Sequence, residues 1–326
     1  MLRDLFSRSC QLVLIKGKKL AWVFIELCLF EALFFCAALH SHEYRYQLSL
    51  CGVFQNEAPY LKEWIDFHKL VGVEHFYLYN NSSTDNYLEI LDPYLKSGEV
   101  ELIPWDISHK NVAEFNRLIL CDAYQDANQR SRGETKWLIM IDTDEFIFPV
   151  EKDSLTEFLE DYDEYGSLCV NWQMFGTSNI PFLLPGESML EKLTYKAVKD
   201  FSSNTYTKCI VQPKCVYEIN NPHYPELEPK CVSVNEERKI MRGGQTPYVS
   251  VNKIRINHYW TRDEYFFLNN KIPRRKAWPG NAEIWLEHAS HMNEEFCDLI
   301  IRRHLVRKQL AEEVHNEKIF DIRGAE

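Results

Sequence analysis

The sequence predicts an α/β domain with a mainly parallel sheet flanked by helices. Between residues 47 and 127, apolar segments typical of strands alternate three times with segments whose apolar residues recur at helical spacing. The run 137–141 that follows is apolar at every position, as in a strand buried on both faces at the centre of a parallel sheet. Strands joined through helices run parallel, so the loops after them lie along one sheet edge.

The first half of the chain gives a regular series of elements. Asn56 is expected to cap the first helix, in which Pro59 suits the first turn, and Gly72 is expected to follow its last turn. A polar turn at 80–85 separates the second strand from the second helix. The predicted strands are 48–54, 75–79, 100–105 and 137–141, and the predicted helices are 57–71, 86–95 and 112–127.

The second half is less regular. It contains strand patterns at 146–148, 168–175 and 250–260, and a helix that starts at Ser154. Proline-rich loops at 180–185 and 223–229 are expected to cover a site rather than build a core. The predicted division is an N-terminal hydrophobic segment at 1–45, one domain at 46–292 and a C-terminal charged helix at 293–326, with its helical pattern over 293–318.

Two aspartates, Asp142 and Asp144, follow the fourth strand one residue apart. Ligands of open α/β sheets bind at such strand ends, and two adjacent carboxylates repel each other unless a cation or several donors are present. Oxygen ligands suit a hard divalent metal, which could hold a diphosphate. The alternative is that the pair caps the next element or pairs with surface bases. A second pair, Asp161 and Asp163, follows a helical pattern and is interpreted as a solvated helix end.

The net charge of −11 and the pI near 5.5 argue against nucleic acid as the main partner. The ten cysteines are too few for a disulfide scaffold in a chain of 326 residues, and without a C-x-x-C pair structural zinc is not expected. A disulfide among Cys209, Cys215 and Cys231 is possible if the domain faces an oxidising compartment.

Residues 20–39 are mostly apolar and follow a basic segment, which predicts a single-pass signal anchor with a cytoplasmic N-terminus. Glu26 and Glu31 weaken this prediction, since each costs roughly 2.5 to 3.5 kcal/mol near the bilayer centre. The alternatives are a cleaved signal peptide ending near Ala37 and Ala38, and a helix packed on the domain.

Three motifs at three strand ends resemble those of GT-A glycosyltransferases: Phe54-Gln-Asn-Glu-Ala, Asn80-Asn-Ser-Ser-Thr-Asp and Ile141-Asp-Thr-Asp-Glu-Phe. Four further motifs are similar to glycosyltransferase family 92: Leu61-Lys-Glu-Trp-Ile-Asp-Phe-His, Asn171-Trp-Gln-Met-Phe-Gly-Thr, Lys208-Cys-Ile-Val-Gln-Pro and Ile256-Asn-His-Tyr-Trp. The resemblance covers about residues 47–276. It implies a GT-A fold and transfer of a hexose, with galactose favoured, from a UDP-sugar to a glycan hydroxyl with inversion.

The resemblance also implies a metal site. Asp144 would be a direct ligand, and Asp142 would reach the ribose or, through water, the metal. His258 is the candidate third ligand, because neutral imidazole suits Mn²⁺, the expected cofactor. Without the resemblance, His258 is equally well explained as an ordinary strand histidine.

Further roles follow from the resemblance. The nucleoside would be held by Asn56, Glu57, Asn80, Asn81 and Asp85, although many relatives place an acidic residue where this chain has Asn80 or Asn81. The diphosphate would meet Lys208 and the basic group Lys271, Arg274, Arg275 and Lys276 when a C-terminal loop closes. The acceptor sugar would stack on Trp172 and Phe175, for which a core position is the alternative. Inversion requires a carboxylate base, which the sequence does not place; Glu145 adjoins the metal pair and is one candidate, and Glu187, Asp200 and Glu218 are the unranked alternatives.

Three other functions compete with this interpretation. Phosphatases of the haloacid dehalogenase type also carry D-x-D after an apolar strand. They normally carry it on the first strand and have Thr or Val two residues later, where this chain has Phe146. A glycoside hydrolase needs two carboxylates across a cleft, which adjacent residues supply poorly. A sugar-binding domain of the same fold without catalysis is the third alternative.

Overall fold

The computed structural model describes residues 44–275 and 282–305. The described fold belongs to the unit Arg45–Glu326, which is compact on its own. The apolar segment 20–39, Lys276 and residues 306–318 of the predicted tail helix lie outside the described residues. Within the described part of the chain, no helix combines the length and apolar character needed to cross a membrane.

The first half of the domain forms the predicted parallel sheet. Strands β1 (Tyr46–Phe54), β2 (His75–Asn80), β3 (Val100–Pro104) and β4 (Thr135–Met140) lie in the order β3-β2-β1-β4, and every pair is parallel. The connections are α2 (Ala58–Leu70), α3 (Tyr87–Ser97) and one long helical stretch made of α4 (Val112–Glu114), η1 (Phe115–Cys121) and α5 (Asp122–Ser131). The predicted alternation and the shared edge of the strand ends are confirmed.

The second half adds antiparallel pairings through β8 and β5, so the sheet is mixed although most of its strand pairings are parallel. Strand β8 (Thr207–Val211) runs antiparallel between β4 and β6 (Ser167–Met174). Strand β12 (Ile254–His258) is parallel to β6 and antiparallel to β5 (Glu145–Pro149), and β11 (Ser233–Val234) adds to β6. The main path is therefore β3-β2-β1-β4-β8-β6-β12-β5.

The remaining elements are short. They are α6 (Leu155–Leu159), η2 (Glu160–Tyr162), α7 (Met189–Lys192), β7 (Tyr195–Lys196), η3 (Ser202–Thr205), η4 (Pro213–Cys215), β9 (Val216–Asn221), β10 (Tyr224–Leu227), α8 (Glu264–Phe266), η5 (Phe267–Lys271), α9 (Ile272–Arg275), α10 (Ala282–Ser290), β13 (Glu295–Phe296) and η6 (Ile301–Leu305). The predicted helix start at residue 293 is wrong, because β13 pairs there with β7.

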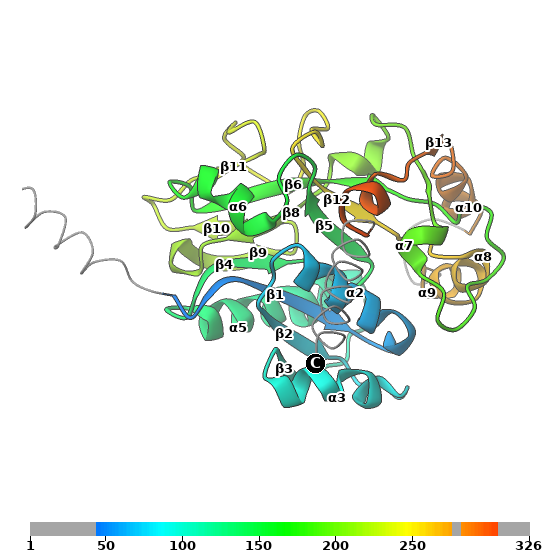
Figure 1. Ribbon diagram of the computed structural model, residues 1–326, viewed down its shortest axis with the longest axis horizontal. Helices are drawn as coiled ribbons and strands as arrows, with labels where there is room; N and C mark the ends of the chain where they lie inside the picture. Colours follow the sequence, from blue (N-terminus) through cyan, green and yellow to red (C-terminus); the bar gives the residue numbers. More distant parts are fainter. Residues whose placement is uncertain (1–43, 276–281, 306–326) are drawn as a thin grey trace, which may run out of the picture. The chain divides into compact units, whose positions relative to one another are not determined.

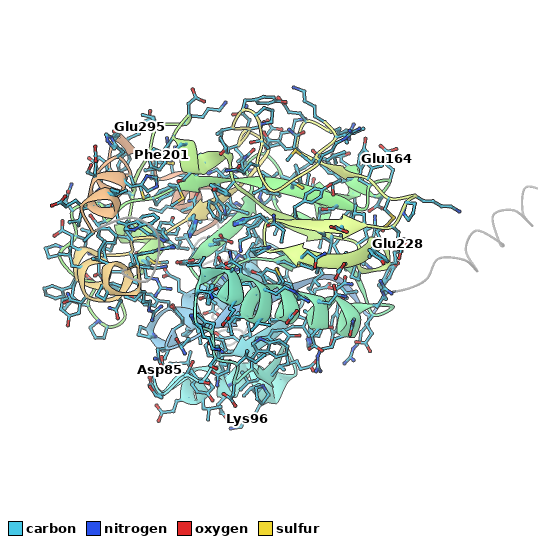
Figure 2. All side chains as sticks on the ribbon, turned by 180° about the vertical axis from the view of Figure 1, so that it is seen from behind. Asp85, Lys96, Glu164, Phe201, Glu228 and Glu295 are labelled. Atoms are coloured by element: carbon cyan, nitrogen blue, oxygen red, sulfur yellow. A yellow bond between two sulfur atoms is a disulfide. The ribbon has the colours of Figure 1, made fainter. Side chains whose placement is uncertain are left out.

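Helices cover both faces of the sheet. Helix α2 covers one face (Figure 1). Its Trp64 and Ile65 are fully buried in a cluster with Phe76 and Phe146, as the helical spacing predicts. The opposite face, seen from behind in Figure 2, is covered by η1 and α5. There Tyr124 belongs to a second apolar cluster with residues of β1, β2 and β4. Helix α5 therefore lies on the reverse side of the sheet from α2.

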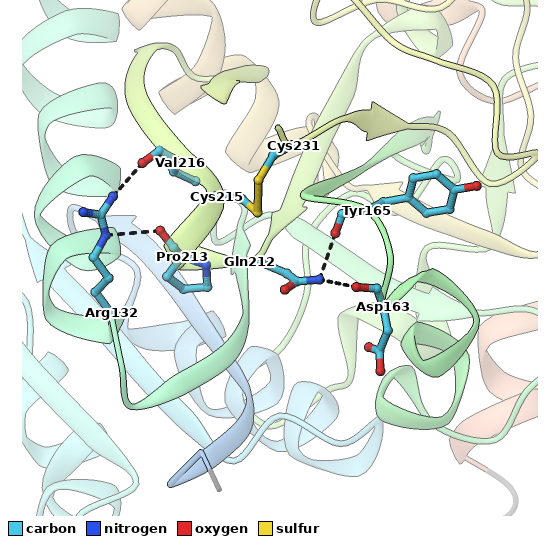
Figure 3. The surroundings of a disulfide bond; sticks show 8 residues. All are labelled: Arg132, Asp163, Tyr165, Gln212, Pro213, Cys215, Val216 and Cys231. Atoms are coloured by element: carbon cyan, nitrogen blue, oxygen red, sulfur yellow. Dashed lines mark hydrogen bonds between the residues drawn. A yellow bond between two sulfur atoms is a disulfide. The ribbon is translucent and has the colours of Figure 1, made fainter. Parts of the chain in front are cut away.

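A disulfide joins Cys215 and Cys231, so the predicted pairing within the group of three cysteines is confirmed (Figure 3). Beside it, Gln212 donates from Nε2 to the carbonyl oxygens of Asp163 and Tyr165, both at 2.8 Å. These bonds and the disulfide hold the segment after β8 against the start of β6.

Candidate functional site

The acidic pair lies where the parallel and mixed parts of the sheet meet. Asp142 follows β4, and a tight turn in which the Glu145 N–H donates to the Asp142 carbonyl leads into β5. In the sheet, His258 at the end of β12 lies directly opposite Glu145. The turn and the adjacent strand thus bring Asp142, Asp144, Glu145 and His258 together, although His258 is more than a hundred residues away in the sequence.

Asp142 is held by two donors. Lys208 Nζ lies 2.9 Å from its Oδ1, and the Tyr124 hydroxyl donates to the same oxygen at 3.0 Å. Burial acts to raise the pKa of Asp142, but the ammonium of Lys208 outweighs it, so the net pKa lies below the usual value. Lys208 is 1 % exposed and Asp142 is 32 % exposed. Asp142 is therefore an oriented anion with one side open to solvent.

Asp144 faces a different pair of groups. Its Oδ2 lies 2.6 Å from Lys271 Nζ, and its Oδ1 lies 3.4 Å from His258 Nε2. Burial acts to raise the pKa of Asp144, yet Lys271 and His258 lower it well below the ordinary value. The Tyr259 N–H donates to the Asp144 carbonyl at 2.9 Å and ties the turn to β12. The site thus holds its two aspartates ionised, each beside its own lysine.

Glu145 is fully buried, which bears on its predicted role as the base. Its Oε2 accepts the Asp142 N–H at 3.0 Å, and its Oε1 lies 3.8 Å from His258 Nδ1. Burial raises the pKa of Glu145 well above the usual value. Because the side chain is fully buried, it has no access to an acceptor hydroxyl, which argues against its predicted role as the base. Its two carboxyl oxygens instead hold the turn, through the Asp142 N–H, and lie beside the Nδ1 edge of the His258 ring.

The predicted metal ligands are only partly assembled. Asp144 and His258 face each other, whereas Asp142 is engaged by Lys208 and Tyr124. Among the residues that the structure describes, no group of three His, Cys, Asp or Glu side chains is arranged to hold a metal by itself. One carboxylate and one imidazole suit a dication that takes its other ligands from substrate phosphates and water.

The loop after β1 uses its polar side chains to hold the next loop. Asn56, with a φ of 57°, accepts the Thr84 N–H on its Oδ1 at 2.7 Å. The predicted cap by Asn56 is wrong, since Glu57 is the residue before the first turn of α2 and Asp85 Oδ2 accepts the Ala58 N–H at 2.8 Å. Asn56 and Asp85 thus join the two loops, and a strained backbone held this firmly is typical of a binding site.

The loop after β2 is held in the same way. Asn80 accepts the Ser83 N–H on its Oδ1 at 2.9 Å, and Asn81, which is 6 % exposed, donates from Nδ2 to the carbonyl oxygens of Trp105 and Ile107. The side-chain amides of Asn80 and Asn81, which were predicted to bind the nucleoside, are thus used to hold the loop in shape. A nucleoside bound here would contact mainly the backbone of this loop.

Glu57 forms a buried ion pair that the sequence did not predict. Its partner is Arg262, which is fully buried and carries a positive φ of 54°. The guanidinium lies over the ring of Tyr60 at 3.7 Å and the ring of Phe266 at 4.5 Å. The pair connects the start of α2 to the segment after β12, and no local sequence pattern indicates a contact between residues so far apart.

Of the predicted basic group, Lys271 reaches the acidic pair, with its Nζ 2.6 Å from Asp144 Oδ2. Arg275 lies over the indoles of Trp260 at 5.4 Å and Trp285 at 5.1 Å. Arg274 is exposed, and Lys276 lies outside the described residues.

The two predicted acceptor aromatics have different environments. The Trp172 ring lies 4.5 Å from the His258 ring and 5.2 Å from the His223 ring, edge-on to both. Phe175 is 0 % exposed and packs on Tyr259, so its position is not compatible with stacking on a sugar. Only Trp172 belongs to the site.

Among the alternative bases, Glu187 accepts the Leu184 N–H and pairs with Lys192, which explains its carboxylate without a catalytic role. Asp200 is exposed in the turn before η3, and Glu218 lies on β9 opposite Glu226.

The fold and the site define an α/β protein with a pair of aspartates at the carboxyl end of a parallel strand. Residues 45–285 match the family model of glycosyltransferase family 92. The chain belongs to this family.

Curated relatives agree with this assignment. A glycosyltransferase family 92 protein of Oryza sativa subsp. japonica is 25% identical over 224 residues, covering 68% of this chain and 34% of the relative. Galactan beta-1,4-galactosyltransferase GALS3 of Arabidopsis thaliana is 26% identical over 230 residues, covering 66% of this chain and 41% of the relative. The chain thus spans less than half the length of either relative.

A solved structure with partial likeness is that of S. aureus TarS 1–349 in complex with UDP. It is 17% identical, with a TM-score of 0.32, and the match covers 51% of this chain and 47% of that chain. A likeness at this TM-score supports no conclusion about this chain.

Proposed function

We propose that this domain is a metal-dependent glycosyltransferase of the GT-A type that moves a hexose, with galactose favoured, from a UDP-sugar to a glycan hydroxyl with inversion. The observation that carries the proposal is the pair of ionised aspartates at the carboxyl end of β4, with His258 beside Asp144 and a lysine beside each carboxylate. Galactose is favoured because a relative is named as a galactosyltransferase.

The diphosphate of the donor would bind beside Asp144 and His258. Mn²⁺ held by these two side chains would supply positive charge that stabilises the diphosphate as the bond to the sugar breaks. Lys271 contributes a second positive charge, since its ammonium lies 2.6 Å from Asp144 and is partly exposed. Lys208 keeps Asp142 ionised and in place, where its open side can accept a hydroxyl of the ribose.

The transfer itself is a single displacement in this proposal. The acceptor oxygen attacks the anomeric carbon, the bond from that carbon to the diphosphate breaks, and the bonding electrons leave with UDP. Trp172 lies beside His258 and forms part of the surface next to the transferred sugar. Inversion requires a base near the acceptor hydroxyl, and buried Glu145 does not supply it.

We also propose that residues 20–39 anchor the chain in a membrane with the N-terminus in the cytoplasm. The support is the apolar sequence and the basic residues that precede it. Carbonate extraction of the full chain from membranes tests this, because an anchored chain stays in the pellet and a peripheral one is released.

The decisive experiment measures UDP release from a panel of UDP-sugars with Mn²⁺ or with a chelator. Asp144→Ala is expected to lower the rate by at least about 100-fold, as expected when a group that stabilises charge in the transition state is removed. Asp161→Ala is the matched control, because Asp161 belongs to the second D-x-D sequence and is 57 % exposed. Activity that survives both the chelator and Asp144→Ala would contradict the proposal, and UDP binding without turnover would indicate a binding domain.

A further inference from the structure

A second histidine packs against Trp172. The Trp172 ring lies 4.5 Å from the His258 ring and 5.2 Å from the His223 ring between ring centres, with both contacts edge-on. His223 lines a cavity of about 250 Å³. The cavity is lined by Tyr206, Asn221, His223, Gly243, Gly244 and Gln245. The donor site proposed above uses none of these residues.

The cavity has the size and lining of a site for one sugar ring. Its volume is below the range of about 300 to 1,000 Å³ that is typical for drug-sized ligands. Tyr206 is 37 % exposed, so part of its ring is open for stacking. Gln245 offers an amide donor and acceptor, whereas Asn221 offers its amide donor because its Oδ1 already accepts the His223 N–H at 2.9 Å.

The imidazole of His223 is held in one orientation. Its Nδ1 lies 2.9 Å from the Thr207 carbonyl oxygen, a contact in which Nδ1 must donate. A side chain at residue 244 would collide with it, since a Cβ added to Gly244 would lie 2.4 Å from the His223 Cβ. With Nδ1 protonated, the lone pair of the neutral ring is on Nε2.

The same strand connects this histidine to the acidic pair. Thr207, which accepts from His223, is the neighbour in β8 of Lys208, which binds Asp142. Burial, followed by the charge of Lys208, lowers the pKa of His223 to about 4, so the ring is neutral near neutral pH. The Nδ1 contact thus fixes the ring and leaves the lone pair of Nε2 as an acceptor for a hydroxyl group.

We propose that this cavity binds the accepting sugar and that Nε2 of His223 receives the proton of the attacking hydroxyl. The inference rests on the proposed donor site at Asp142 and Asp144, and it names the acceptor subsite and the base of that reaction. Trp172 then borders both parts of the site, since its ring contacts His258 of the donor site and His223 of the acceptor cavity.

The proposed step balances. The acceptor O–H gives its proton to Nε2 while its oxygen forms the bond to the anomeric carbon of the donor. The bond from that carbon to the diphosphate oxygen breaks, and UDP leaves with the electron pair. The imidazolium then returns its proton to water, and His223 regains the neutral form.

The first test is His223→Asn, whose side-chain amide keeps a donor near the position of Nδ1 and removes Nε2. With UDP-galactose and a panel of methyl glycosides as acceptors, kcat for transfer is expected to fall by about 10² to 10⁴, the usual effect of a general base. The dissociation constant for UDP and the KM for the acceptor are expected to stay within about threefold, which separates loss of chemistry from loss of structure. His75→Asn is the matched control, because His75 is also buried and lies at the other end of β2 from the loops of the site.

The second test concerns the sugar platform. Tyr206→Ala is expected to raise the acceptor KM by about tenfold, Tyr206→Phe is expected to keep the KM, and Tyr217→Ala on β9 is the exposed control. This pair of variants decides the subsite even if His223→Asn fails to fold.

The outcomes distinguish this inference from the function on which it rests. Normal kcat in folded His223→Asn, or an unchanged acceptor KM in Tyr206→Ala, would overturn the inference. The proposed glycosyltransferase function would still stand if the unmodified protein transfers the sugar. Failure of the unmodified protein to bind UDP or to transfer sugar would overturn both.

Discussion

Lys208→Met tests whether a buried ammonium holds the acidic pair in place. Lys208 is 1 % exposed, and its Nζ lies 2.9 Å from Asp142 Oδ1, 3.9 Å from Glu145 Oε2 and 3.2 Å from the Tyr124 hydroxyl. Methionine has nearly the same length and no charge, so the change removes the charge while filling most of the space. Asp142 then keeps a single strong donor, the hydroxyl of Tyr124.

The structure sets the expected magnitude. Removing one partner of a buried ion pair typically costs about 3 to 5 kcal/mol, because the other charge is left uncompensated. Asp142 is 32 % exposed and regains part of its hydration, which reduces the cost. Glu145 lies farther from the ammonium, at 3.9 Å, and is therefore expected to add less. The expected loss is about 2 to 3 kcal/mol in the free energy of unfolding at neutral pH.

Urea unfolding measures this loss, with Lys136→Met as the matched control. Lys136 pairs with Asp163 at 2.7 Å, but the two side chains are 26 % and 47 % exposed, so its removal should cost less than about 1 kcal/mol. Adding Asp142→Asn to Lys208→Met should recover part of the loss, since no unpaired charge remains. If Lys208→Met costs no more than Lys136→Met, the charge of Lys208 does not hold the site together.

Three further predictions concern stability. Burial lowers the pKa of His68 to about 3 from an ordinary value of 6.5, so the stability that neutral His68 contributes is present above pH 6.5 and is lost as the pH falls. In urea unfolding, the stability advantage of the unmodified protein over His68→Gln should shrink by about 2 kcal/mol between pH 7.5 and 5. A difference that stays constant with pH would contradict this. Reduction of the disulfide between Cys215 and Cys231, which are 16 residues apart, should cost about 3 kcal/mol in the same measurement, with Cys215→Ser insensitive to the reductant. Arg262→Met should cost about 3 kcal/mol because it leaves Glu57 buried without its partner, and a thermal melt equal to that of the unmodified protein would refute the role of the pair.

Local patterns predicted the parallel half of the fold because each of its elements is encoded by adjacent residues. The strand at 137–141 was found at Thr135–Met140, and the two aspartates lie at its end as expected. The antiparallel insertion of β8 was not predicted, because pairing between β4 and β8 joins residues about seventy positions apart. That pairing brings Lys208 to Asp142, so the contact that organises the site has no local signal.

Strand geometry explains why one of the two acceptor aromatics was assigned wrongly. Side chains alternate between the faces of a strand, so residues three apart, such as Trp172 and Phe175, point to opposite faces. Trp172 lies beside His258, whereas Phe175 is in the core. The cavity beside His223 was missed for another reason, since 223–229 was interpreted only as a covering loop and the residue that makes room for the histidine is the distant Gly244.

The two lysines of the site differ in a way that assigns them different parts in the proposed reaction. Lys208 is buried in the sheet, and its ammonium bonds to Asp142 and Tyr124. Moving the ammonium away would leave the charges of Lys208 and Asp142 without their partners. Lys271 lies on the short segment η5, is 17 % exposed and contacts Asp144 from outside the sheet. A dication that binds Asp144 must displace the ammonium of Lys271, because like charges repel at this distance. The freed ammonium is then positioned to meet the diphosphate that accompanies the metal, whereas Lys208 stays fixed beneath the site.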